Sequence, residues 1–334
     1  MVAGSVSGWR LAPTTGASSI PTLVQELRRG HLVAGGRGPA ATGFEPIDTV
    51  LDGGLLPGEL VLVGGQPGAG KTILALQWAR YLAGRGRPVI YACYEHDEAA
   101  LFHRLLVQEL AVLDPAAEPG ERIEARAVAR ELTLGTATMA EAMTRSPLVG
   151  HAVAGLERSL SHLLLLSASA RATTADELVR QVDEQTGPGA VLIVDYLQKV
   201  PAAGGPSVEE RVARTVEVMK ELAVSRRVTV VALAAAGAKG IEAGRLRLHQ
   251  LRGADALAHE CDIALVLNDK ATAVADHHLK FDLTRLDDAR RRTVVSVEKN
   301  RRGEANLHLE LTRDFANFRF EPRGAFLSEA MSDA

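Results

Sequence analysis

The stretch Leu60-Val61-Leu62-Val63-Gly64-Gly65-Gln66-Pro67-Gly68-Ala69-Gly70-Lys71-Thr72 decides the fold of this chain. Its apolar, β-branched beginning predicts a buried strand, and residues 72–82 have helical periodicity. Between them, Gly65 to Thr72 satisfy the pattern G-x-x-x-x-G-K-[ST]. Glycines let backbone N–H groups curl around phosphates at the positive end of a helix, Lys71 reaches the β- and γ-phosphates, and the Thr72 hydroxyl holds Mg²⁺. The sequence therefore predicts a site for ATP or another nucleoside triphosphate with Mg²⁺.

The bulk composition is that of a soluble globular protein. The chain has 334 residues, of which 46% are hydrophobic and 24% charged, so one large α/β domain or two modest ones are expected. The net charge of −3 argues against a globally basic nucleic-acid coat but leaves room for a local basic lining. Cys93 and Cys261 lie in apolar runs without metal-ligand spacing and are expected to be buried thiols. With neither a secretory signal nor a membrane-spanning stretch, we expect a cytoplasmic protein with no membrane contact.

Strands and helices alternate along the chain from residue 42 onward. Near-continuous apolar runs predict strands at residues 60–64, 88–93, 163–167, 190–196, 228–234 and 262–267. Helical patterns lie between them, at residues 72–82, 98–113, 174–185 and 208–225 and, with breaks, over 114–160. Residues 293–299 and 305–312 predict a closing β-hairpin. This order predicts an α/β fold, a mainly parallel sheet covered by helices on both faces.

We expect three segments. Residues 1–40 form a flexible arm, residues 41–322 the α/β domain, and residues 323–334 a disordered tail. Within the arm, residues 21–29 predict a short amphipathic helix with Leu23, Val24 and Leu27 on one side. A lone helix of this size is marginal in water, so it needs a surface on which to pack. That surface is either its own domain or a neighbouring subunit.

Two acidic residues follow predicted strands. Asp195 ends the run Ala190-Val191-Leu192-Ile193-Val194, where a carboxylate is costly unless it meets a cation, so it is a candidate Mg²⁺ partner; a helix cap is the alternative. Glu95 follows the strand at residues 89–93, which we expect beside the phosphate-loop strand. It is a candidate for the base that orients water on the γ-phosphate, and a solvated loop glutamate is the alternative.

Read together, five segments resemble the ATPase domain of the DnaB-like replicative helicases, within the RecA-like superfamily, over about residues 40–320. They are residues 42–44 with 53–58, the phosphate loop, Tyr94-Glu95-His96, Val194-Asp195-Tyr196-Leu197-Gln198 and Lys299-Asn300-Arg301-Arg302-Gly303. The resemblance implies a RecA-like core in a ring, usually a hexamer, with ATP at each interface. It makes Glu95 the catalytic base and Asp195 the Mg²⁺-shell acid. Lys299 and Arg301 match positions that reach into the neighbour's site to stabilise the γ-phosphate.

Residues 237–253, which we call the basic loop, are a candidate for DNA contact. They carry Lys239, Arg245, Arg247 and Arg252 against one acid, Glu242. The resemblance implies that loops at this position contact single-stranded DNA, and basic groups on such loops bind phosphates without reading sequence. An ordinary surface loop is the alternative.

Three departures from the family pattern separate nucleotide binding from strand separation. Ala234 and Ala235 replace a Ser-Gln pair whose glutamine senses the γ-phosphate, and an alanine side chain makes no hydrogen bond. Gly253 replaces an acidic residue, and only the short arm, in place of the family's N-terminal helical domain, precedes the core.

These patterns leave three readings open. The leading one is an ATPase ring of the DNA helicase or translocase type that moves on single-stranded DNA. The second is an ATP-switched scaffold or regulatory ATPase with a protein partner, which residues 1–40 are placed to bind. A RadA- or KaiC-like ATPase explains residues 195–198 less well, and the four-cysteine zinc module expected of the RadA type is missing.

Overall fold

The computed structural model describes residues 19–29, 38–113, 118–201, 207–274, 283–329 and 331. Most of the predicted arm, residues 1–18 and 30–37, lies outside this range, as do residues 330 and 332–334 of the predicted tail.

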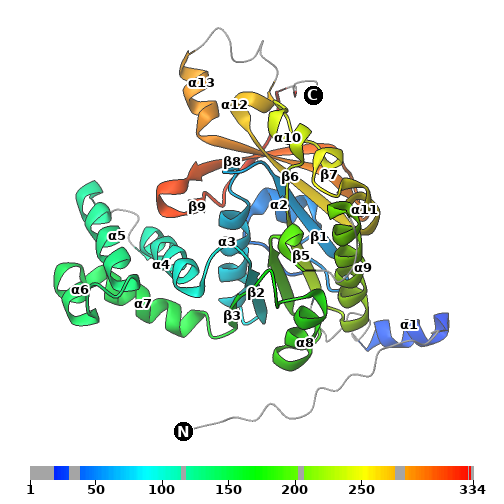
Figure 1. Ribbon diagram of the computed structural model, residues 1–334, viewed down its shortest axis with the longest axis horizontal. Coiled ribbons are helices and arrows are strands. Elements are labelled where there is room, and N and C mark those ends of the chain that lie inside the picture. Colours follow the sequence, from blue (N-terminus) through cyan, green and yellow to red (C-terminus); the bar gives the residue numbers. More distant parts are fainter. Residues whose placement is uncertain are drawn as a thin grey trace.

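One sheet runs through the domain in the order β10-β8-β7-β6-β1-β5-β4-β2-β3, and β9 pairs with β8 (Figure 1). The six strands from β6 to β3 in this order are parallel, whereas β7, β8 and β10 run antiparallel. The predicted α/β class, with its closing hairpin, is confirmed. The strands are β1 (Leu60–Gly65), β2 (Val89–Cys93), β3 (Leu163–Ser167), β4 (Val191–Asp195), β5 (Thr229–Ala235), β6 (Ile263–Asp269), β7 (Arg292–Asn300), β8 (Leu307–Asp314), β9 (Arg319–Phe320) and β10 (Ala325–Phe326).

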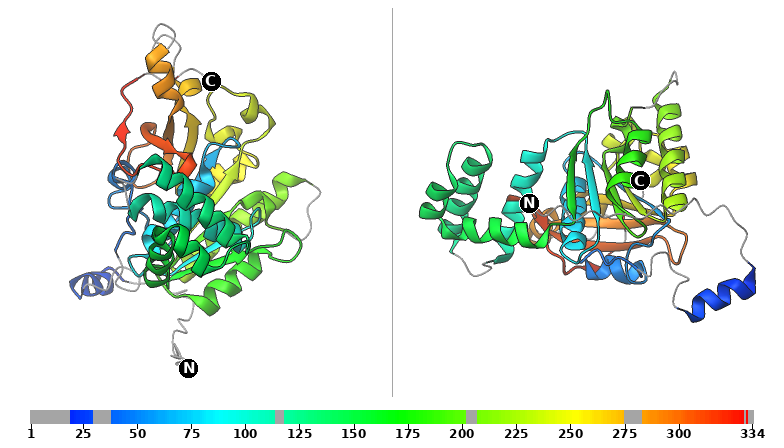
Figure 2. Two further views of the ribbon diagram at one scale, coloured as in Figure 1. Left: turned by 90° about the vertical axis from the view of Figure 1, so that its left-hand side faces the viewer. Right: turned by 90° about the horizontal axis from the view of Figure 1, so that it is seen from below.

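Helices cover both faces of the sheet, and each face has its own apolar cluster. One cluster, which contains the fully buried Trp78 and Tyr91, joins the sheet to α2 (Glu45–Val50), α3 (Lys71–Ala83), α4 (Glu98–Leu113), α5 (Pro119–Thr133), α6 (Met139–Arg145) and α7 (Pro147–Ser159). The other, around Met219, involves α8 (Ala175–Gln185), α9 (Val208–Arg226) and α11 (Ala254–Glu260). Figure 2 shows α5, α6 and α7 projecting to one side of the sheet. Burial from both faces explains why β1, β2 and β4 have no alternation of polar and apolar residues.

The strand that precedes Glu95 is not a neighbour of the phosphate-loop strand, so that prediction is wrong. Strands β5 and β4 lie between β1 and β2. The chain leaves β1 through α3, which contacts β5, β4 and β2, so the crossover skips two positions that later strands fill. The acidic ends of β2 and β4 nevertheless lie at the same edge of the sheet as the phosphate loop, because all these strands are parallel.

Both ends of the chain contain more structure than a flexible arm and a frayed tail. In the arm, α1 (Ile20–Arg28) forms as predicted, and Ile20 and Leu27 are 71% and 61% exposed. Whether this apolar face packs on a neighbouring subunit stays a prediction. In the tail, Ala325 and Phe326 pair with β8, so this part is not disordered. Two-residue pairings carry no periodicity, which is why the sequence pattern missed this one. In the described part of the chain, no helix is long and apolar enough to cross a membrane.

Candidate functional site

The phosphate loop forms a tight turn that glycine makes possible. Gly68 and Gly70 have φ values of +78° and +96°, where a side chain is strained. A Cβ at Gly70 would also lie 2.6 Å from the Phe320 ring and 2.8 Å from the Phe315 ring. Helix α3 begins directly afterwards at Lys71, with no side-chain cap and no acidic residue in its first turn. The positive end of the helix is therefore open to an anion.

Lys71 lies at the centre of this turn. Its Nζ donates hydrogen bonds to the carbonyl oxygens of Gly65 (2.8 Å) and Gln66 (3.0 Å). Burial lowers the pKa of the Lys71 ammonium, while the nearby charges of Asp195 and Glu95 oppose that shift. The predicted phosphate-binding cation thus faces the two predicted acids.

Asp195 is buried at the end of β4, with 2% of its surface exposed. Its Oδ2 accepts a hydrogen bond from the Tyr91 hydroxyl (2.8 Å), and its carboxylate is also hydrogen-bonded to the Thr72 side chain. Both partners are hydroxyl groups, which argues against the helix-cap alternative. Burial raises the pKa of Asp195, because a desolvated carboxylate favours its neutral form unless a cation compensates.

A Mg²⁺ ion fits this pair. Oxygen ligands suit the ion, and a hydroxyl with a carboxylate beside a phosphate loop is the minimal protein contribution that it uses together with nucleotide phosphates. Among the described residues no group of three or more His, Cys, Asp or Glu side chains forms an all-protein metal site. The Mg²⁺ assignment of Thr72 and Asp195 stays a prediction with favourable geometry.

Glu95 is exposed in the turn after β2. Its charge acts on the pKa of both Lys71 and Asp195, so its carboxylate lies close to the phosphate loop although β2 is two strands away. The backbone N–H of Tyr94 donates to the carbonyl oxygen of Asp195 (2.7 Å), which fixes the start of this turn against β4. Its role as a base remains a prediction.

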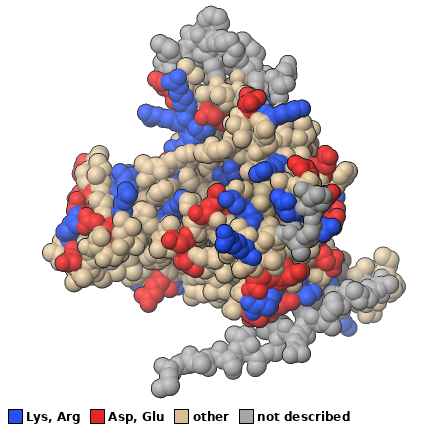
Figure 3. Space-filling model, viewed as in Figure 1, with Lys and Arg blue, Asp and Glu red and all other residues tan. Residues whose placement is uncertain are grey.

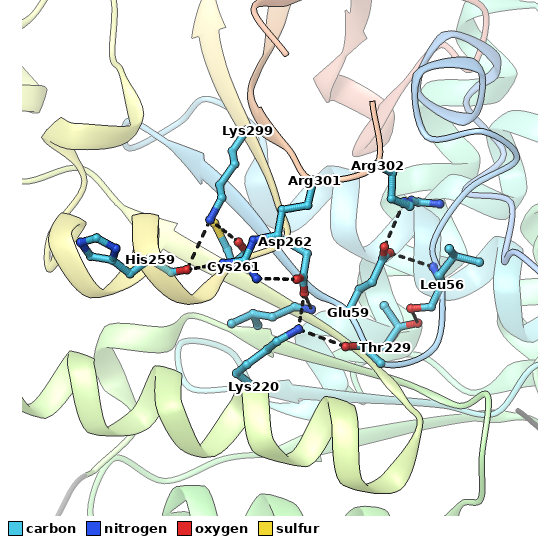
Figure 4. A network of polar contacts seen from close by, with 12 residues as sticks. Leu56, Glu59, Lys220, Thr229, His259, Cys261, Asp262, Lys299, Arg301 and Arg302 are labelled. Carbon is cyan, nitrogen blue, oxygen red and sulfur yellow. Dashed lines mark hydrogen bonds and ion pairs between the residues drawn. The ribbon is translucent and has the colours of Figure 1, made fainter. Parts of the chain in front are cut away.

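Lys299 and Arg301 lie elsewhere, around Asp262 (Figure 4). Lys299 Nζ donates to the carbonyl oxygens of Ala258 and Cys261, both at 2.6 Å, at the carboxyl end of α11. Arg301 donates to Asp262 Oδ1 (3.1 Å) and to the carbonyl oxygen of His259 (2.7 Å). The sequence pattern did not single out Asp262, because a lone acid before an apolar run is common.

These two cations are far from the phosphate loop of their own chain. Ile263, at the start of β6, pairs with Asn300, and the N–H of Leu60, at the start of β1, donates to Asp262 Oδ2 (2.8 Å). The phosphate loop follows the other end of β1, which has six residues. At about 3.3 Å per residue, roughly 16 Å of strand separates the two groups. The structure brings Lys71, Thr72, Asp195 and Glu95 together and leaves Lys299 and Arg301 apart from them.

The four basic residues of the basic loop are not equivalent. Lys239 and Arg252 are exposed. Arg245 is only 8% exposed, and both Arg245 and Arg247 pair with Glu298, at 3.6 Å and 2.8 Å. Counting charges within the loop missed Glu298 because it comes from β7. DNA contact by all four stays a prediction, for which Lys239 and Arg252 are the better placed.

The thiols take no part in this chemistry. Cys93 and Cys261 are both buried and free, as predicted. Burial raises the pKa of each to about 11, so both are protonated at neutral pH.

Comparison with known proteins places this geometry in a family. The model of the family described as DnaB-like helicase C terminal domain matches residues 40–320. The DNA repair protein RadA of Campylobacter jejuni is 44% identical over 61 residues, which are 18% of this chain and 14% of that protein. RadA of Escherichia coli is 57% identical over 37 residues, 11% of this chain and 8% of that protein. The chain thus matches only a small part of these curated relatives.

Two solved structures have the same fold. One is an isolated ATPase domain, which superposes with a TM-score of 0.70 at 18% identity, over 91% of this chain and 99% of that one. A DnaB-like replicative helicase, solved in a study of its interactions with primase, gives a TM-score of 0.65 at 18% identity, over 91% of this chain and 67% of that one. At this identity the superpositions speak for the fold, and the family follows from the match over residues 40–320: this chain belongs to the DnaB-like helicase C-terminal domain family.

Proposed function

We propose that this chain binds ATP with Mg²⁺ at its phosphate loop and hydrolyses it in a homo-oligomeric ring, expected to be a hexamer, that acts on single-stranded DNA. Family membership and the site geometry both support this proposal. The observation that carries it is the separation of the catalytic groups. One edge of the sheet holds Lys71, Thr72, Glu95 and Asp195, and the opposite edge of the same strands holds Lys299 and Arg301.

This separation argues for a shared site. Phosphoryl transfer needs cations on the γ-phosphate as charge develops in the transition state. Within one chain, Lys71 is the cation at the loop, and Arg301 is held at the far edge by Asp262. A second copy supplies the missing cations if its Arg301 edge packs against the first copy's phosphate loop. Arg301 is suited to this, since half of its side chain is exposed.

Each residue then has a defined task. The turn 65–70 and the start of α3 bind the phosphates, and Lys71 neutralises their charge. Bound Mg²⁺ would supply Lewis-acid stabilisation of the phosphate oxygens, held by Thr72 and Asp195. Glu95 orients the attacking water and accepts its proton.

Mixing two inactive variants tests the shared site. Arg301→Ala should bind ATP normally but lose turnover by about 10³-fold, the lower range for an arginine that acts in trans. Glu95→Gln should also be inactive. In an equal mixture, about a quarter of the interfaces pair an intact Glu95 half with an intact Arg301, so turnover should reappear.

Arg290→Ala is the matched control, because Arg290 is an exposed arginine paired with Asp287 next to the other end of β7. This variant should turn over ATP like the wild type. A mixture of Arg301→Ala and Glu95→Gln that stays silent, although the two variants assemble together, would refute action across the interface.

A second candidate function is an ATP-switched scaffold with a protein partner. The pairing of Arg245 and Arg247 with Glu298 favours it, because it leaves fewer exposed cations on the basic loop. Figure 3 also shows acidic and basic side chains interspersed over the visible face. Fluorescence anisotropy with labelled oligo-dT separates the two functions. Arg252→Ala should lower the salt dependence of binding by about 0.7 in the log–log slope if Arg252 contacts one phosphate. An absence of binding at low salt with ATP present would leave the scaffold as the better reading.

A further inference from the structure

A glutamine of the phosphate loop reaches directly into the basic loop. Gln66 Nε2 donates to the carbonyl oxygens of Gly240 (2.8 Å), Ala243 (2.9 Å) and, at a longer distance, Ile241 (3.3 Å). An amide group has only two N–H donors, so the two short contacts use both of them. The backbone of Gln66 meanwhile accepts from Lys71 Nζ (3.0 Å). One residue therefore contacts both the phosphate-binding lysine and the middle of the basic loop.

A second glutamine holds the end of the basic loop. Gln198 lies in the short turn η2 (Leu197–Lys199), just after Asp195. Its Nε2 donates to the carbonyl oxygen of Arg252 (2.9 Å), and its Oε1 accepts from the N–H of Ala235 (3.1 Å). The strand end that carries the predicted Mg²⁺ acid is thus tied to the exposed Arg252.

Between these two attachments the basic loop is folded on itself. The N–H of Gly237 donates to the carbonyl oxygen of Gln250 (2.8 Å), and the N–H of Arg252 donates to that of Ala235 (3.0 Å). Gly240 is packed so closely that a Cβ there would lie 2.5 Å from Leu246. A compact loop held at two points moves as a unit when either attachment moves, because hydrogen bonds tolerate only a few tenths of an ångström.

The strand that enters the basic loop offers no such side-chain contact. Strand β5 ends at Ala234 and Ala235, whose methyl groups neither donate nor accept hydrogen bonds. The polar side-chain contacts between the nucleotide-binding elements and this loop therefore come from the phosphate loop and from the turn after β4.

We propose that Gln66 and Gln198 link the nucleotide site to the basic loop, so that nucleotide at the phosphate loop orders the basic loop and changes its affinity for single-stranded DNA. The inference rests on the proposed function, since it takes ATP and DNA as the two ligands. The coupling is reciprocal: DNA on the basic loop changes nucleotide affinity by the same factor. Both glutamines are positioning residues, which act through the loop backbone.

Hydrogen–deuterium exchange of the full chain tests this link without requiring turnover or DNA. The amides to follow are those of Ile241, bonded to Gly237, and of Arg252, bonded to Ala235. Each protein is measured alone and saturated with a non-hydrolysable ATP analogue and Mg²⁺, at concentrations set from its own affinity for a fluorescent ATP analogue. We expect nucleotide to slow exchange of these amides about tenfold in the wild type, within the usual range of allosteric coupling.

Three variants give the comparison. Gln66→Ala and Gln198→Ala should each reduce the nucleotide response to about twofold or less, which is what the loss of one of two attachments predicts. Gln77→Ala is the matched control. Gln77 also makes two side-chain hydrogen bonds, to the N–H and the carbonyl oxygen of Phe320, but not to the basic loop. It should keep the full response.

The outcomes separate the link from the proposed function. A wild type that binds no nucleotide overturns the proposed function, and the link with it. A wild type that binds nucleotide without a change in the loop overturns the link alone. Full responses in saturated Gln66→Ala and Gln198→Ala overturn it as well. Since each variant removes a different attachment, failure of one to fold leaves the other to decide.

Discussion

Asp262 joins three elements at the lower edge of the sheet, and its removal should cost about 3 kcal/mol of folding free energy. Its side chain is 11% exposed and accepts from Lys220 Nζ (2.6 Å) and from the N–H of Leu60 (2.8 Å), besides Arg301 (3.1 Å). Asp262→Ala leaves the Lys220 ammonium, itself 20% exposed, with only the carbonyl oxygen of Gly58 (3.2 Å). Breaking a buried ion pair costs about 3–5 kcal/mol, and the partial exposure of Lys220 favours the lower value.

Arg301→Ala provides the contrast within the same network. Its side chain is half exposed, so losing this pair should cost less than about 1 kcal/mol. The two substitutions thus separate stability from the proposed catalytic role: Asp262→Ala destabilises the chain, whereas Arg301→Ala mainly removes turnover.

Urea unfolding followed by far-UV circular dichroism measures the difference. With a slope of about 3 kcal/mol/M, Asp262→Ala should shift the midpoint by about 1 M. Adding Lys220→Met to Asp262→Ala removes the unpaired ammonium and should recover about 1 kcal/mol or more. A loss below about 1 kcal/mol for Asp262→Ala, or no recovery in the double variant, would show that the buried pair does not contribute as reasoned.

Three further predictions concern the nucleotide site. Lys71→Ala should abolish binding of a fluorescent ATP analogue or turnover, and unchanged turnover would refute the site assignment. Gly70→Ala should destabilise the chain by about 2 kcal/mol or more in thermal unfolding, because of its positive φ and the approach of Phe320; an unchanged melting temperature would contradict this. Burial raises the pKa of Asp195 above its unfolded value, so the folded chain loses stability as pH rises through that pKa. Asp195→Asn should therefore be more stable than the wild type at pH 7 without ligand, with the difference vanishing below about pH 4, and it should lose Mg²⁺-dependent nucleotide binding. Equal stability at both pH values would contradict the sign.

The fold was predictable from sequence because its main signals are local. The apolar runs at β1, β2 and β4 are unbroken since both faces are covered, and the phosphate loop announces itself by its glycines and by Lys71. Asp195 was identifiable for the same reason, as a carboxylate at the end of a buried strand. The neighbourhood of Glu95 was only half predictable: its edge of the sheet follows from parallel strands, but the order of strands does not.

What sequence missed depends on contacts between distant segments. Glu298 neutralises part of the basic loop from a strand about fifty residues later, so a local charge count overestimates the exposed cations. Gln66 lies 174 residues from Gly240, and Asp262 lies 42 residues from Lys220. Such pairs leave no periodic trace in a single sequence.

The positions of Lys299 and Arg301 make each chain directional: it offers cations at one edge of the sheet and needs them at the other. Copies joined in this way form a head-to-tail series, which either closes on itself or continues as a filament. In an open series the last phosphate loop meets no donor, so the number of complete sites is one fewer than the number of chains. Closure gives every chain a complete site. Turnover per chain would then report whether the series is closed, and opening a single interface would silence one site while the remaining interfaces keep theirs.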